Sequence, residues 1–284
     1  MMILAVDLGN YNVKTSEEII FSSRFIKENE EVPIGEETIE YDGNFYTIGK
    51  GEFENVFNKS KKNYIPNLLY AIAKSVPVKE KNIDLVLGVP LDNLNIKEKF
   101  KEDLKGKTFK FKVNGKDREV TIERLATIGE GLSSYYALPK ADMKKDIIIF
   151  DIGGRTTNIV TFIDGKLEKK FTVSTGVIDL YDNIKTKVNL KEGQNFKVEE
   201  IERLIKNEII TDIEDDKLDI LTKIFNSAEL KVKKETYVNY FTGGGSIVLQ
   251  DTISSLVPKA KFFDNPLFSN VIGNKKVALV KWGE

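Results

Sequence analysis

Two segments of the sequence place a carboxylate, glycine and polar side chains in the same order. The first is 7–14 (DLGNYNVK). A carboxylate that follows an apolar run can hold a magnesium ion through water, and Gly9 lets backbone amides approach a phosphate because it has no Cβ. The side chains that would meet a nucleotide are those of Asp7, Asn10, Asn12 and Lys14. A hairpin turn that binds nothing is the alternative.

The second segment, 151–157 (DIGGRTT), repeats this arrangement with Asp151, two glycines and two hydroxyl groups. The glycines are Gly153 and Gly154, and the hydroxyl groups belong to Thr156 and Thr157. We expect these residues to contact phosphates as well, with a tight hairpin as the alternative. Arg155 could contact a phosphate or a neighbouring subunit, or it could be a solvated turn residue.

Three consecutive glycines, Gly243, Gly244 and Gly245, follow an aromatic-rich segment and precede an apolar run that starts at Ile247. A glycine loop that enters the N-terminus of a helix is suited to binding an anion or a nucleotide. A flexible loop without a ligand is the alternative, although consecutive glycines lose much conformational entropy on folding.

Glu130 lies in the segment 127–134 (TIGEGLSS), at the start of a stretch with helical periodicity. A carboxylate at this position could orient or deprotonate a water molecule that attacks a phosphate. It could instead interact only with the positive end of the helix dipole.

The apolar pattern predicts an α/β fold that holds these segments. Apolar runs predict buried strands at Ile3–Val6, Asp84–Val89, Asp146–Phe150 and Val277–Val280. Helical periodicity predicts helices at Ile96–Leu104, Glu130–Leu138 and Val198–Ile210. Residues 270–273 (NVIG) fit the end of a helix with a glycine cap, just before the last strand. The strand–turn–strand pattern shared by 2–14 and 147–160 predicts a duplicated domain.

The composition restricts the chemistry. The 284 residues include no cysteine and no histidine, which excludes disulfides, thiolate chemistry and zinc–cysteine sites and removes the usual general base. Phosphoryl transfer suits the remaining carboxylates, lysines and hydroxyl groups because it depends on positioning and charge stabilisation. Neither a Walker P-loop nor a G-x-G-x-x-G motif occurs.

Charge and hydropathy indicate where the protein acts. The formal net charge of −1 argues against strong direct binding to DNA. No apolar stretch is long enough to span a membrane, and the N-terminus lacks the features of a signal peptide. We therefore expect a cytoplasmic protein without a membrane partner.

The order of these segments resembles that in the superfamily of actin, sugar kinases and heat-shock chaperone ATPases: two Asp-x-Gly hairpins, a glutamate-bearing connector between them and a glycine loop after them. The resemblance implies an α/β fold with duplicated actin-like (ribonuclease H-like) domains and a nucleotide cleft between them. Domain I would comprise residues 1–140 and 268–284, with a small outer subdomain at about 28–75. Domain II would comprise residues 141–267, with a small outer subdomain at about 187–234.

Within this superfamily, segments 150–154 (FDIGG), 176–180 (GVIDL) and 270–273 are similar to those of the plasmid-segregation actins of the ParM/StbA type. The resemblance implies an ATPase that polymerises with ATP into a helical filament and segregates plasmid DNA through a DNA-binding adaptor of the ParR type. ATP, or GTP in its place, and Mg²⁺ would be the cofactors.

The resemblance also implies roles for individual residues. Glu130 would activate the attacking water, and Asp151 would also be catalytic. Asp7 and Asp151 would hold the magnesium ion, mainly through water. Phosphates and nucleoside would be contacted by Lys14 and by the backbone near Gly9, Gly153, Gly154, Gly243, Gly244 and Gly245.

Two other functions remain open. A small-metabolite kinase of the same superfamily would need a second substrate site, typically with an aspartate base, and the glutamate at position 130 argues mildly against it. A structural relative that does not hydrolyse nucleotide is the other. The aromatic residues of segment 28–75 and the charges of 187–234 fit filament contacts, or else subdomain core and solvated surface. These aromatic residues are Phe45, Tyr46, Phe53, Phe57 and Tyr64.

Overall fold

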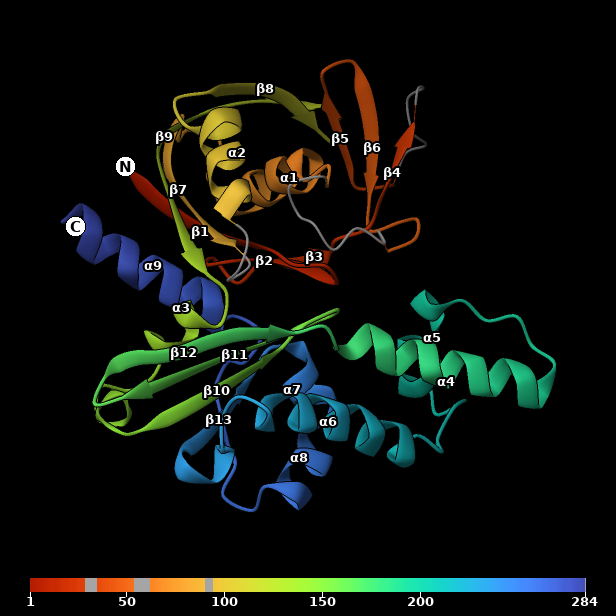
Figure 1. Cartoon of the computed structure of the whole chain (residues 1–284). Helices are drawn as coiled ribbons and strands as arrows, with labels where there is room; N and C mark the ends of the chain where they lie inside the picture. Colours follow the sequence, from red (N-terminus) through yellow and green to blue (C-terminus); the bar gives the residue numbers. More distant parts are fainter. Residues whose placement is uncertain (29–34, 54–61, 90–93, 284) are drawn as a thin grey trace. The chain divides into compact units, whose positions relative to one another are not determined.

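The computed structural model describes residues 1–28, 35–53, 62–89 and 94–283. Its internal contacts divide the chain into two units (Figure 1). Unit 1 comprises Met1–Ala137 and Phe268–Glu284, and unit 2 comprises Leu138–Leu267. The C-terminal segment therefore belongs to the same unit as the N-terminal part of the chain.

The sheet of unit 1 has the strand order β3-β2-β1-β7-β9-β8-β5-β6-β4. β1 lies inside this sheet, antiparallel to β2 and parallel to β7. All its residues after Met2 are buried, which explains why it is apolar along its length except at Asp7. The strands are β1 (Met2–Leu8), β2 (Asn12–Thr15), β3 (Ile20–Ser22), β4 (Phe25–Glu28), β5 (Thr38–Tyr41), β6 (Asn44–Ile48), β7 (Asn82–Val89), β8 (Thr108–Val113) and β9 (Lys116–Gly129).

Helices cover both faces of β1 (Figure 1). Leu4 and Val6 belong to the main core, in which they pack with apolar residues of α1. Because side chains alternate between the faces of a strand, Asp7 faces the other side, where α9 contacts β1 and β7. The helices of unit 1 are α1 (Ile65–Ser75), α2 (Leu94–Leu104), α3 (Leu132–Tyr135) and α9 (Ser269–Trp282).

Unit 2 repeats this topology in a smaller sheet with the order β12-β11-β10-β13-β14. Strand by strand it corresponds to β3-β2-β1-β7-β9, because β10 is antiparallel to β11 and parallel to β13. The repetition confirms the duplicated α/β fold predicted from the sequence. The strands are β10 (Ile147–Ile152), β11 (Thr157–Ile163), β12 (Lys166–Val173), β13 (Val238–Thr242) and β14 (Lys261–Phe262).

The core of unit 2 contains the stacked rings of Phe150 and Phe241, with centroids 5.1 Å apart, and Phe225 packs edge-on against Phe150. Phe225 comes from α6, so the aromatic cluster attaches this helix to the sheet. The α-helices of unit 2 are α4 (Val177–Glu192), α5 (Val198–Lys206), α6 (Glu214–Glu229), α7 (Gly244–Val248) and α8 (Gln250–Leu256), and short 3-10 turns lie at Asp142–Lys144 and Lys234–Thr236.

The prediction for the C-terminal region is wrong. Residues 277–280 belong to α9 and do not form a strand, and the helix expected to end at Gly273 continues to Trp282. Its glycine cap is Gly283, with φ of 72°. A short apolar run fits one turn of a helix as well as a buried strand. Here Ala278 is buried while Val280 is 85% exposed, as on a helix with one buried face.

Other predicted elements differ mainly in length. The helix expected over 130–138 is the short α3, and the one expected over 198–210 ends at Lys206. The strands expected at 3–6 and 84–89 lie within β1 and β7, and the one at 146–150 overlaps β10. In the described part of the chain, no helix combines the length and the apolar character needed to cross a bilayer.

The aromatic residues of segment 28–75 form core more than surface. Tyr46, Phe53 and Tyr64 are buried, and Phe45 is half-buried. Phe57 lies outside the described residues. These buried rings therefore offer no ready filament contact.

Candidate functional site

The turn between β1 and β2 places Asp7 opposite Lys14, because the two residues pair across the strands. Gly9 is required for the tightness of this turn. A Cβ on Gly9 would lie 2.4 Å from the backbone oxygen of Asn12, a distance that any side chain would violate. The carbonyl of Asn10 accepts a hydrogen bond from Ser23 Oγ at 2.7 Å, which holds the tip of the turn against the next strand.

Asp7 is 6% exposed, and its two carboxylate oxygens have different surroundings. Oδ2 lies 3.8 Å from Lys14 Nζ. Oδ1 is buried and has no hydrogen-bond partner among the described residues. Because an ionised carboxylate is costly to bury without partners, this oxygen is suited to accept a hydrogen bond from a ligand or from metal-bound water.

Gly88 marks the point at which three distant parts of unit 1 meet. A Cβ on Gly88 would lie 3.6 Å from Glu130 Cγ, 3.7 Å from Asn274 Nδ2 and 3.7 Å from Asp7 Oδ1. β7, which carries Gly88, lies between β1 and β9 and so brings Asp7 near Glu130. The structure thus brings together two predicted site residues in unit 1 and adds Asn274, which the sequence analysis missed.

A signal for Asn274 exists in the sequence. Val271, Asn274 and Ala278 are fully buried and follow the spacing of one helix face. The apolar run 277–280 also fits a strand, and in that interpretation the helical spacing of the buried amide is lost.

The start of α9 holds the turn that carries Glu130. Asn270 Oδ1 accepts hydrogen bonds from the backbone N–H of Gly131 at 3.1 Å and from Ser133 Oγ at 2.9 Å. A Cβ on Gly273 would lie 1.8 Å from the carbonyl oxygen of Ser133, so only glycine permits this approach of α9 to α3. Gly273 is therefore a packing residue inside the helix and not its cap.

In unit 2, the turn between β10 and β11 repeats the arrangement around Asp151. Asp151 is 6% exposed and pairs with Asn158, the counterpart of Lys14 in unit 1. The Gly153 N–H donates to the Thr156 carbonyl at 2.9 Å and closes the turn. Thr157 is fully buried and its hydroxyl donates to the Thr175 carbonyl at 2.9 Å, so this proton is already used within the fold.

The start of α4 is bonded to the same turn. The N–H groups of Val177 and Ile178 donate to the carbonyls of Gly153 at 3.0 Å and Gly154 at 2.7 Å. A Cβ on Gly176 would lie 2.6 Å from the carbonyl carbon and oxygen of Gly154. Gly176 is thus what allows the helix to approach the turn.

The glycine loop after β13 lies against Asp151. Gly243 has φ of 81°, and a Cβ there would lie 2.6 Å from Asp151 Oδ1. A Cβ on Gly245 would lie 2.2 Å from Ile152 Cγ2, whereas one on Gly244 would meet nothing nearer than Leu267 Cδ2 at 3.7 Å. In unit 2 the structure therefore brings together the predicted segments 151–157 and 243–245.

The described residues contain no group of three or more carboxylates close enough to enclose a metal ion. A hydrated magnesium ion needs fewer direct ligands, since Mg²⁺ keeps several waters and accepts one or two carboxylates. The unpartnered Oδ1 of Asp7 fits this mode of binding.

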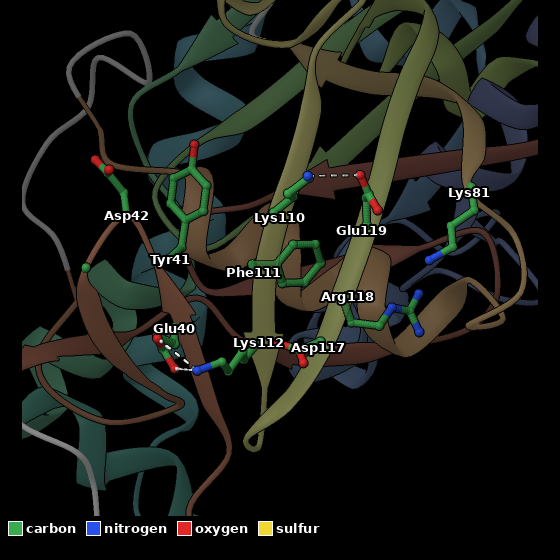
Figure 2. Close-up of a pocket in the computed structure, with 11 residues that line it drawn as sticks. Glu40, Tyr41, Asp42, Lys81, Lys110, Phe111, Lys112, Asp117, Arg118 and Glu119 are labelled. Carbon is green, nitrogen blue, oxygen red and sulfur yellow. Dashed lines mark hydrogen bonds and ion pairs between the residues drawn. The ribbon is translucent and has the colours of Figure 1, made fainter.

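A hollow of about 430 Å³ also lies on unit 1, lined by the β5–β6 turn, the β8–β9 hairpin and Lys81 (Figure 2). None of the predicted site residues lines it. Figure 2 shows Lys112 paired with Glu40 and Lys110 paired with Glu119, at 3.0 and 3.6 Å. Arg118 donates to the Val76 carbonyl at 2.8 Å. Three of the four cationic side chains that line the hollow are therefore engaged within the fold.

Comparison with known proteins points to one group. Residues 5–132 match the family described as the N-terminal domain of actin-like proteins. The chain superimposes on Ta0583, an archaeal actin homolog, with a TM-score of 0.84 and 19% identity over 98% of this chain and 99% of that one. Ta0583 in complex with ADP gives a TM-score of 0.81 at the same identity, over the same shares of the two chains.

Two further structures extend this similarity. A non-polymerisable mutant of pCBH ParM gives a TM-score of 0.81 with 21% identity, over 97% of this chain and 98% of that one. The Alp12 filament structure gives a TM-score of 0.69 with 21% identity, over 99% of this chain and 98% of that one. No curated protein sequence matches the chain.

Proposed function

Because the chain has the actin fold and residues 5–132 match the N-terminal domain of the actin-like proteins, we propose that it is a filament-forming ATPase. One observation carries the proposal. Each duplicated sheet carries a buried aspartate, Asp7 or Asp151, one residue before the end of β1 or β10, and a glycine turn of matching register follows. In this proposal units 1 and 2 correspond to domains I and II, with outer subdomains at about 28–75 and 187–234.

The proposed chemistry is hydrolysis of ATP accompanied by Mg²⁺. The bound ion would supply positive charge to the phosphates, and Asp7 and Asp151 would hold its waters. Lys14 and the backbone at Gly9, Gly153 and Gly154 would bind the phosphates. Gly243, Gly244 and Gly245 would lie beside the nucleoside. Asn10, Asn12 and Thr156 complete the proposed set of nucleotide contacts, whereas Thr157, which is buried and donates to Thr175, is left out of it.

Glu130 is the proposed residue that orients the attacking water. Its backbone N–H donates to the Val89 carbonyl at 2.8 Å, and the following turn is bound to Asn270. A carboxylate on such a fixed turn loses little freedom when it binds water, which favours catalysis.

We further propose that the chain polymerises with ATP and segregates plasmid DNA through an adaptor of the ParR type. The structural similarity to pCBH ParM and to Alp12, whose structure is a filament, supports self-association. The net charge of −1 supports an adaptor over direct DNA binding.

Sedimentation with ATP and Mg²⁺, together with phosphate release, tests this proposal in wild type and in Glu130→Ala. We expect both proteins to pellet with ATP. The variant should release phosphate more slowly than wild type by a factor of about 100 or more, as for loss of a general base. Glu123→Ala is the matched control, because Glu123 is an exposed glutamate on β9, the strand that leads to Glu130.

Two outcomes would contradict the proposal. A wild-type protein that stays monomeric with ATP at tens of micromolar is not a filament former. Normal phosphate release by Glu130→Ala, together with normal release by the control, would remove Glu130 from its proposed role.

A further inference from the structure

Asn274 is a buried amide that the fold itself does not satisfy. Its side chain is fully buried, and neither Oδ1 nor Nδ2 has a hydrogen-bond partner among the described residues. Asn270, one helical turn earlier, instead accepts two hydrogen bonds. A buried amide without partners destabilises a fold, so its presence calls for a partner from outside the chain.

The helix that carries Asn274 is held on both sides of it. Gly273 packs directly on the Ser133 carbonyl, and Lys275 Nζ lies 2.7 Å from Glu17 Oε1. Near the C-terminal end, the Arg124 guanidinium lies 4.8 Å from the Trp282 ring centroid and pairs with buried Asp84 at 2.5 Å. Asn274 therefore cannot reach solvent by a shift of the helix without breaking these contacts.

The Asn274 amide faces a second unpartnered group. Asn274 Nδ2 and Asp7 Oδ1 each lie 3.7 Å from the same point, the position of a Cβ on Gly88. Both atoms lie near Gly88 and neither makes a direct hydrogen bond, so one water between them can accept from Nδ2 and donate to Oδ1. Gly88 leaves room for that water because it has no side chain.

We propose that Asn274 is a positioning residue that fixes the Asp7 carboxylate through a bridging water. Asp7 is then held on both sides, by Lys14 at Oδ2 and by Asn274 through water at Oδ1. A fixed carboxylate binds a hydrated divalent cation more tightly than a mobile one, since partners behind a ligand orient it. This inference rests on the proposed nucleotide binding and assigns the Mg²⁺ dependence of that binding to a residue of the C-terminal helix.

The test measures binding of ADP to the full chain across a range of Mg²⁺ concentrations, where no hydrolysis intervenes. Asn274→Leu keeps the branched outline of the side chain, with a larger volume, and removes both polar atoms. We expect it to raise about tenfold or more the Mg²⁺ concentration at which the effect of Mg²⁺ on ADP binding is half-maximal. This is the size of effect seen when a residue that supports a metal ligand is lost. ADP affinity without Mg²⁺ should stay unchanged, and the melting temperature should not fall.

Gly88→Ala provides a second, independent variant. A methyl group there meets its neighbours at ordinary contact distances of 3.6–3.7 Å, so the fold should tolerate it, but it would crowd a water that bridges Asn274 and Asp7. We expect the same shift in Mg²⁺ dependence. Thr47→Val is the matched control, because Thr47 Oγ1 is also buried and without a hydrogen-bond partner among the described residues, and lies on β6.

The outcomes separate the two proposals. If wild type binds ADP with a clear Mg²⁺ dependence that neither Asn274→Leu nor Gly88→Ala changes, the assignment of Asn274 is overturned and the proposed function stands. A lower melting temperature with unchanged Mg²⁺ dependence would likewise show that Asn274 contributes to the stability of the core and does not position Asp7. If wild type binds no nucleotide, both proposals are overturned.

Discussion

At the scale of single residues, the two copies of the hairpin differ in the residue that pairs with the aspartate. Asp7 and Asp151 occupy the same register position, but the residue across the strand is Lys14 in unit 1 and Asn158 in unit 2. The Asn158 amide is used locally, because its Oδ1 accepts from Thr172 Oγ1 at 2.9 Å. Unit 1 therefore supplies positive charge beside its aspartate, and unit 2 supplies backbone and hydroxyl groups.

This difference predicts the effect of neutralising Lys14. Lys14→Met keeps most of the aliphatic side chain and removes the charge. We expect it to weaken ATP binding about tenfold or more, as for loss of one hydrogen bond to a charged group, and to reduce the salt dependence of binding. Titration with a fluorescent nucleotide at two salt concentrations measures both. Lys27→Met, at an exposed position on β4, is the control, and equal effects of the two changes would contradict the role of Lys14.

At the scale of elements, close backbone approach holds the proposed site together. Gly9, Gly176, Gly243 and Gly273 each stand where a Cβ would collide with backbone atoms of a neighbouring element. Such glycines let a turn, a helix and a strand end meet within a few residues. Substitutions at these positions should therefore lower the stability of the fold, and any loss of activity should follow from that.

Two adjacent glycines of α7 allow a matched test of this idea. A Cβ at Gly245 would lie 2.2 Å from Ile152 Cγ2, whereas one at Gly244 would meet only Leu267 Cδ2, at an ordinary contact distance of 3.7 Å. We expect Gly245→Ala to lower the free energy of unfolding by about 1–3 kcal/mol through overpacking, and Gly244→Ala to leave it unchanged or raise it slightly. Urea unfolding measures both variants. Equal stabilities would show that Ile152 moves aside at little cost.

A hydrogen bond between Tyr64 and Asp103 joins the start of α1 to α2. Tyr64 Oη donates to Asp103 Oδ2 at 2.6 Å. Partial burial by itself raises the pKa of Asp103, but hydrogen bonds from Tyr64 and Lys99 outweigh it and hold the pKa below its usual value. A depressed folded-state pKa contributes stability that is present above the ordinary carboxyl pKa and is lost as pH falls through the folded value.

We therefore expect Tyr64→Phe to lower the free energy of unfolding by about 1 kcal/mol at neutral pH. The difference from wild type should shrink as the pH falls below the ordinary range of an aspartate, because Asp103 then becomes protonated. Urea unfolding at several pH values measures this. A difference that does not change with pH would indicate lost packing rather than a lost bond to a carboxylate.

At the scale of the whole molecule, the repeated topology was predictable and the meeting of distant residues was not. The two Asp-x-Gly hairpins and their apolar strands are local patterns, so the sequence could indicate them and their duplication. The approach of Asp7, Gly88, Glu130 and Asn274 depends on strand order and on where α9 packs. A four-residue apolar run at 277–280 does not distinguish helix from strand, and that ambiguity concealed Asn274.

The return of α9 to unit 1 has a consequence for biosynthesis. A ribosome that has translated residues 1–267 has already produced the strands of both sheets, together with Asp7 and Glu130. The nascent chain still lacks Asn270, so the turn after Glu130 has not gained its side-chain acceptor. The proposed nucleotide site of unit 1 should thus be completed only after residues 268–284 have been translated and have left the ribosome.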